Sequence, residues 1–102
     1  MSRESMSRVE QLASEAIRLG ADALEVEYKD GYEEVVAMRG SAGHEIARLS
    51  SASREAALLR DELHARARRK RRLIVGGGEY ELRVRVYDSF GEEAFRVDLR
   101  RV

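Results

Sequence analysis

The sequence predicts an α+β protein of two layers, in which two helices cover one face of a mostly antiparallel sheet. Apolar residues recur every three or four positions in two segments, and every second position in most of the remaining chain. These are the periods of an amphipathic helix and of a half-buried strand. An Asp-Gly pair and a run of three glycines mark tight turns between strands. The expected element order is α-β-β-(β)-α-β-β-β.

The first helix is predicted over residues 7–19. Ser7 and Glu10 have the spacing of a capping box, and Gly20 suits the position just after the last turn. The apolar positions follow a single helix face: Val9, Leu12, Ala13, Ala16 and Ile17.

A hairpin is predicted next. Residues 24–29 alternate apolar and charged, Asp30-Gly31 suits a two-residue turn, and residues 32–39 form the return strand. Gly40 and Gly43 are expected to interrupt the chain. Residues 45–49 are read as a third strand, with a lead-in to the next helix as the alternative.

The second helix is predicted over residues 52–69, after several serines that can cap it. Its apolar stripe comprises Ala52, Ala56, Leu59 and Leu63. The tail of this helix, RARRKRR at residues 66–72, is expected to place positive charge at the negative end of the helix dipole.

The remainder is predicted as sheet. A short strand at 73–75 turns at glycines 76–78 into a strand at 79–87, and a turn at 88–92 leads to the last strand at 93–102. On that last strand Phe95, Val97 and Leu99 are expected to face the core. With 102 residues the chain suits one domain, with its core at about 7–101.

Composition excludes several classes of protein. The net charge is zero, so no overall field attracts nucleic acid or membranes. There is no cysteine, which excludes disulfides and thiolate chemistry. The apolar runs are too short for a membrane span or a signal peptide, and the first residues, MSRESMSR, are polar. We expect a cytoplasmic protein that does not insert into membranes.

No catalytic pattern is visible. The chain has no phosphate-loop motif, and its three glycines precede a strand. His44 and His64 stand apart from other strong metal ligands. Four glutamates flank the hairpin and are expected to pair with arginines on a solvated strand face: Glu25, Glu27, Glu33 and Glu34. We expect no enzyme, no metal and no cofactor.

Three features keep a binding role open. The first, called the basic cluster below, holds six cations: Arg66, Arg68, Arg69, Lys70, Arg71 and Arg72. The second is Arg83 with Arg85, which we expect to pair with Asp98 or the glutamates. The third is Phe90 beside Gly91, which we expect to anchor the hairpin locally. The basic cluster, or Arg83 with Arg85, can also contact phosphates or an acidic partner.

The order of motifs resembles the N-terminal domain of the type II secretion and type IV pilus assembly ATPases. Residues 9–31 (VEQLASEAIRLGADALEVEYKDG) look like the opening helix and strand of that domain. Residues 43–49 (GHEIARL) resemble its middle segment. Residues 77–84 (GGEYELRV) with 90–92 (FGE) resemble its last hairpin. The resemblance covers residues 8–99.

This resemblance implies a PAS-like fold and a domain that lies over a nucleotide site. In that family the domain supplies arginines to nucleotide phosphates, and the arginine of the L-R-V segment corresponds to Arg83. The Walker motifs of the motor domain are missing, so we expect a free-standing regulatory domain.

The preferred hypothesis is a small non-catalytic adaptor that binds a protein partner or a second copy of itself. The alternative is a module that binds the phosphates of a nucleotide or nucleic acid through Arg83 and the basic cluster. Nucleic acid is disfavoured, because no aromatic residue lies within the cluster to stack on bases.

Overall fold

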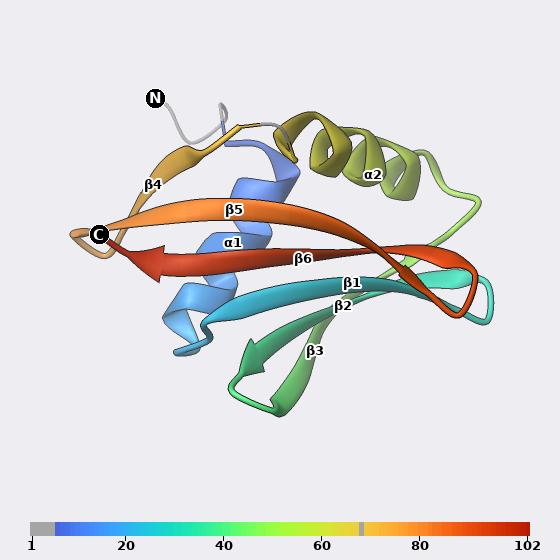
Figure 1. Ribbon diagram of the computed structural model, residues 1–102, viewed down its shortest axis with the longest axis horizontal. Helices are drawn as coiled ribbons and strands as arrows, with labels where there is room; N and C mark the ends of the chain where they lie inside the picture. The colour runs from blue at the N-terminus through green and yellow to red at the C-terminus, as the bar shows by residue number, and fades with distance from the viewer. Residues whose placement is uncertain (1–5, 68) are drawn as a thin grey trace.

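The computed structural model describes residues 6–67 and 69–102 (Figure 1). Within them the chain forms two helices and six strands in the predicted order, with the optional third strand present. Their bounds are α1 Arg8–Arg18, β1 Ala23–Lys29, β2 Tyr32–Arg39, β3 Ala42–Ser50, α2 Arg54–Arg66, β4 Arg71–Val75, β5 Gly78–Ser89 and β6 Glu92–Arg101.

All six strands belong to one sheet, with the order β3-β2-β1-β6-β5-β4. Every neighbouring pair is antiparallel. The first and last strands pair at the centre, where Ala23 lies opposite Asp98 and Val26 opposite Phe95. This central pairing joins the two three-stranded halves into a single surface.

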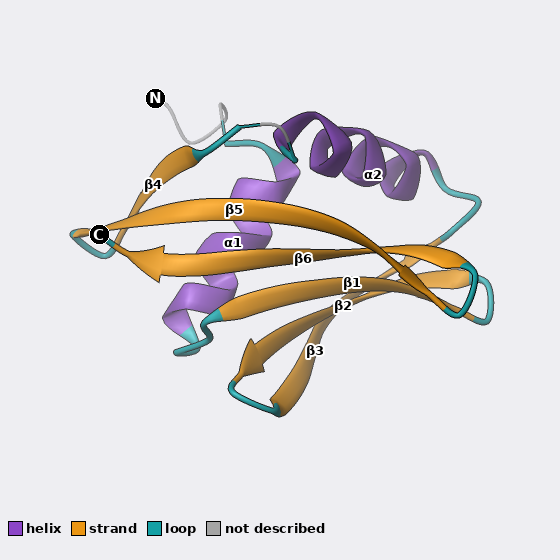
Figure 2. Cartoon of the chain, in the orientation of Figure 1, coloured by secondary structure: helices purple, strands orange, loops and turns teal. Residues whose placement is uncertain are grey.

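Both helices cover the same face of the sheet, and the opposite face, called the outer face below, has no helix on it (Figure 2). The core lies between the two layers. Its largest buried side chains come from both helices and from four strands: Val9, Leu24, Val26, Val35, Leu59, Leu63, Leu82, Phe95 and Val97. The predicted two-layer α+β architecture is therefore confirmed.

Helix α1 begins and ends as predicted. The Ser7 hydroxyl accepts from the Glu10 N–H at 3.1 Å, while the Ser7 N–H donates to Glu10 Oε1 at 3.1 Å. This capping box satisfies two donors that the helix itself cannot pair. Leu19 is the C-cap, and Gly20 takes φ +82°, a conformation that suits glycine.

The first hairpin also agrees with its prediction. Asp30 and Gly31 have φ values of +45° and +92°, as a turn matched to strand twist requires. The expectation for Gly43 is wrong, because β3 already begins at Ala42 and Gly43 pairs with Met38. The register of β3 shifts between Val35 and Val36, which leaves Ile46 as an extra residue.

Helix α2 is shorter than predicted at both ends. The Ser53 hydroxyl accepts from the Ala56 N–H at 3.0 Å, so the helix begins at Arg54 and Ala52 lies in the preceding turn. At the other end, Arg71 and the residues after it pair with β5. Since that backbone is needed for the sheet, the helix ends at Arg66 and does not carry the whole basic cluster.

Strands β4 and β5 are longer than predicted, β6 keeps its predicted length but begins one residue earlier, and the turns between them are tighter. Gly76 and Gly77 form one turn, and Gly78 already pairs with Val75 in the sheet. The turn predicted over residues 88–92 contains only Phe90 and Gly91, because Asp88 and Ser89 continue β5. The predicted inner residues of β6 are buried: Phe95, Val97 and Leu99.

Candidate functional site

The centre of the outer face is a network of ion pairs that satisfies most of its own charges. Arg96 donates to Glu25 at 2.7 Å and to Asp98 at 3.0 Å, and Arg85 donates to Asp98 at 2.8 Å. Hydrogen bonds to Asp98 and Glu25 raise the pKa of Arg96, against the opposing effect of burial. The expected pairing of Arg85 with Asp98 is confirmed, so these arginines are engaged within the fold.

Arg83 differs from Arg85 and Arg96 in its pairing. It lies opposite Asp98 in the β5–β6 register. Both oxygens of Asp98 already accept from other arginines, Oδ2 from Arg85 and Oδ1 from Arg96. Within the described part of the chain Arg83 makes no ion pair and is exposed, so its guanidinium is available to solvent or to a ligand.

The basic cluster is divided between structural and exposed positions. Arg66 is only 11% exposed and bonds Glu62 at 2.8 Å and Glu10 at 3.0 Å, which ties the two helices together. Burial alone would raise the pKa of Glu10, but the Ser7 N–H and Arg66 outweigh it and hold that pKa below its usual value. Arg72 pairs with Glu79 at 3.0 Å on the outer face.

Arg68 lies outside the described residues. The other cations of the cluster, Arg69, Lys70 and Arg71, are exposed.

Two of these cations meet Arg83. Strand β4 pairs with β5 only as far as Leu82, so the connection from α2 to β4 runs beside the next residues of β5. There a hollow of about 210 Å³ is lined by Ala67, Arg69, Lys70, Arg83 and Val84. The structure thus brings Arg83 together with part of the basic cluster, and no carboxylate lines the hollow.

The carboxylates and histidines considered for catalysis do not converge. Glu25 pairs with an arginine on the outer face, as predicted. The prediction for Glu33 is wrong: it faces the helix layer, is buried, and bonds Arg60. His64 contacts Glu93 at 2.7 Å and meets the ring of Phe95 edge-on.

A metal centre is not visible either. The structure over residues 6–67 and 69–102 contains no group of three or more potential metal ligands. Its helices are too short or too polar to cross a membrane.

Phe90 contradicts its predicted role as a local anchor. It is fully exposed and touches no core, and its φ of +52° places it in the left-handed region. That conformation disfavours a bulky side chain, which makes the turn strained as well as apolar. The sequence signal for this site was the phenylalanine itself, at a turn position where Asn or Gly is preferred.

Other partly exposed large side chains lie near Phe90. The β1–β2 and β5–β6 turns lie at the same end of the sheet (Figure 1), where Tyr87 and Ser89 both reach Glu27. Tyr28 is 41% exposed, and Val86 and Tyr87 are exposed to a similar degree. We call residues 27–34 and 86–93 the hairpin end.

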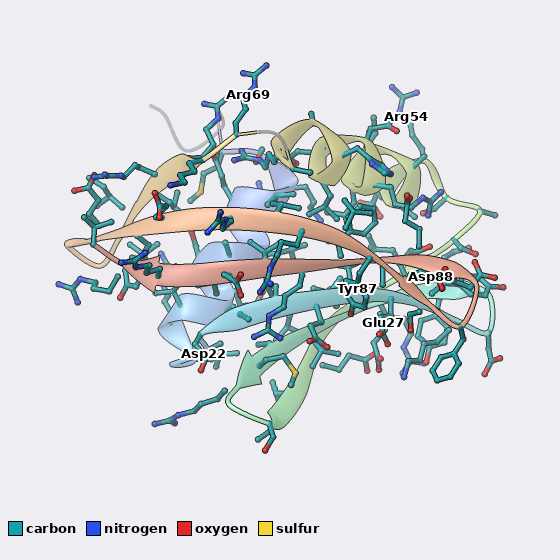
Figure 3. All side chains as sticks on the ribbon, viewed as in Figure 1. Asp22, Glu27, Arg54, Arg69, Tyr87 and Asp88 are labelled. Atoms are coloured by element: carbon teal, nitrogen blue, oxygen red, sulfur yellow. The ribbon has the colours of Figure 1, made fainter. Side chains whose placement is uncertain are left out.

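The hairpin end is also acidic. Its two segments carry seven acidic residues and a single lysine. Figure 3 shows Glu27, Tyr87 and Asp88 close together there, with Arg69 far away beside the start of β4. Burial, and then the charges of Glu25 and Glu27, raise the pKa of Tyr87 to about 12.

A second hollow, called the apolar hollow below, lies at the opposite end of β2. It measures about 250 Å³ and has a mostly apolar lining. Four small residues contribute to it, and the whole lining comprises Leu19, Ala21, Ala37, Arg39, Ala42, Gly43 and His44. No local sequence pattern predicts this hollow, because its walls come from the α1–β1 connection, β2 and β3.

Comparison with protein-family models and with curated proteins finds no match to this chain.

Proposed function

We propose that this chain is a small non-catalytic adaptor or regulatory module that binds another protein through its hairpin end. One observation carries the proposal: Phe90 is fully exposed in a backbone conformation that suits Asn or Gly better. Such a residue costs stability without stabilising the fold, which is typical of positions kept for binding. Exposed aromatic side chains are frequent anchors of protein interfaces.

The charge of the hairpin end indicates the class of partner. In the part of the chain that the structure describes, six of the seven acidic residues are not neutralised by burial against an arginine, as Glu33 is by Arg60, so anionic membranes and nucleic acids are repelled. A partner with an apolar pocket and basic residues at its rim is complementary to this end.

Site-specific photo-crosslinking in the native cells tests the proposal. A photoreactive residue at position 90 should give a defined crosslinked product, which an excess of parent chain displaces and an excess of the Phe90→Asn variant does not. Position 74 is the control, because Ile74 is a 70% exposed apolar residue on β4, away from the hairpin end. Equal products from both positions, or none from position 90, would refute the proposal.

A second candidate function rests on the hollow between Arg69, Lys70 and Arg83. Three cations without a neighbouring carboxylate suit a phosphate group, and guanidinium can donate to two phosphate oxygens at once. Amide chemical shifts during a titration with Mg-ATP test it. Shifts at these residues should be lost in Arg83→Gln and kept in Arg85→Gln, since Arg85 is paired with Asp98. No shifts at millimolar ligand would exclude this candidate.

The resemblance to the N-terminal domains of secretion and pilus-assembly ATPases belongs to the proposal as well. We propose that the fold is of the PAS-like type found in that family, supported by an antiparallel sheet with helices on one face. We also propose a cytoplasmic location, supported by a sequence that contains no cysteine.

A further inference from the structure

The apolar hollow is large enough for one aromatic ring. Its volume is about 250 Å³, and a dry apolar cavity of ~150 Å³ already accommodates benzene. Alanine and glycine leave this space open, because their side chains end before they can fill it. The hollow opens to the surface beside Ala42, which is exposed at the start of β3.

The rim of the hollow is complementary in charge to the hairpin end. Arg39 and His44 are the titratable residues of its lining, and no carboxylate is among them. An aromatic side chain surrounded by acidic residues is therefore favoured there over one surrounded by basic residues. The chain itself presents such a side chain at Phe90.

One copy cannot make this contact with itself. Strand β2 begins at Tyr32 in the hairpin end and ends at Arg39 beside the hollow. Its eight residues separate the two sites by roughly 25 Å. Any contact between Phe90 and the hollow must therefore join two molecules.

We propose that Phe90 of one copy enters the apolar hollow of a second copy, in a head-to-tail contact. This inference rests on the proposed function, and it names the second copy as a partner of the hairpin end. Because the two surfaces differ, the contact is heterologous and each added copy presents a new free end. The assembly grows into a chain unless it closes into a ring.

The contact is small, since a single aromatic side chain and its charged surroundings form it. Interfaces of this size are weak and transient, and complementary charges at their rims make them sensitive to salt. We expect association in the range of ~0.1–1 mM at low salt, and at least a tenfold weakening when the anchor is removed.

Sedimentation velocity of the purified full chain tests the proposal with variants that retain the fold. Phe90→Asn removes the anchor and suits the turn. Ala42→Trp fills the hollow from an exposed position, and His44→Glu adds a negative charge beside Arg39 at the rim. Ile74→Ser is the matched control, because it removes an exposed apolar side chain elsewhere.

The parent chain and Ile74→Ser should associate as concentration rises, and each of the other three variants alone should remain monomeric. An equimolar mixture of Phe90→Asn and Ala42→Trp should recover association and stop at two chains, because only one intact contact can form in it.

Two results would overturn the inference. One is a parent chain that stays monomeric to millimolar concentration at low salt, and the other is association that persists in Phe90→Asn. Crosslinking from position 90 to a different protein, with a monomeric purified chain, would leave the proposed function standing. If position 90 gives no crosslinked product and the purified chain stays monomeric, both the proposed function and the head-to-tail contact are refuted.

Discussion

Arg60 of α2 lies over Glu33 of β2, and its Nη1 donates to Glu33 Oε2 at 2.7 Å. Glu33 faces the helix layer, and only 5% of its side chain is exposed. A carboxylate in this position is costly unless a cation neutralises it. Arg60 therefore attaches α2 to the sheet, although its own side chain is partly exposed.

We expect Arg60→Leu to lower the free energy of unfolding by ~1–3 kcal/mol, because it leaves the Glu33 carboxylate buried and unpaired. Glu33→Leu should cost less, since the freed Arg60 side chain can reach water. Urea denaturation of both variants and of the double variant measures the difference. If Arg60→Leu proves the milder of the two changes, Glu33 is not a buried charge that depends on Arg60.

Arg66 and Arg69 provide a test of how the basic cluster is divided. Arg66→Ala should lower the free energy of unfolding by ~1–3 kcal/mol, because Glu10 and Glu62 both lose a partially buried partner. Arg69→Ala removes an exposed cation and should change stability by about 0.5 kcal/mol or less. Thermal denaturation compares them, and equal effects would contradict the division.

Tyr87 should ionise later in the folded protein than in the unfolded chain. Its pKa is raised from 10.0 to about 12. Because the unfolded chain ionises first, the contribution of Tyr87 to stability is complete below pH 10 and is lost between pH 10 and about 12. Ultraviolet titration should show one late tyrosinate that is missing in Tyr87→Phe. An unchanged late titration in that variant would assign it to another tyrosine.

Phe90→Asn should stabilise the protein. Asn takes the left-handed conformation more readily than Phe, and Asn-Gly is a favoured pair for this turn. We expect a gain of ~0.5–1 kcal/mol in the free energy of unfolding, measured by urea denaturation. A loss of stability would mean that Phe90 packs against the fold, which would also remove the basis of the proposed function.

Gly31→Val should destabilise the first hairpin. Gly31 has a φ of +92°, a conformation that a β-branched residue resists at a cost of ~1–2 kcal/mol or more. The same substitution at Gly76 in the β4–β5 hairpin is a useful comparison, because its φ is also positive. Hairpin formation can be followed by amide hydrogen exchange at β1 and β2. Unchanged protection in Gly31→Val would contradict the turn geometry.

Local rules account for the elements that sequence analysis located well. The capping box of α1 and the Asp30-Gly31 turn each involve residues within a few positions of one another. The predicted end of α2 was too late, because a contact with a distant segment decides where this helix stops. Arg71 has good helix propensity, but its backbone pairs with Leu82 on a strand that follows later in the chain.

Sequence alone determined the two layers, the hairpins and the inner face of β6, because apolar periodicity and turn chemistry act over short stretches of chain. Tertiary structure decided the partner of each charge. Arg85 forms an ion pair with Asp98, whereas Arg83, which lies opposite Asp98 in the register, does not. It also decided that Phe90 is exposed and that small residues leave a hollow at the far end of β2. These features depend on which distant segments meet, and a pattern confined to neighbouring residues does not contain that information.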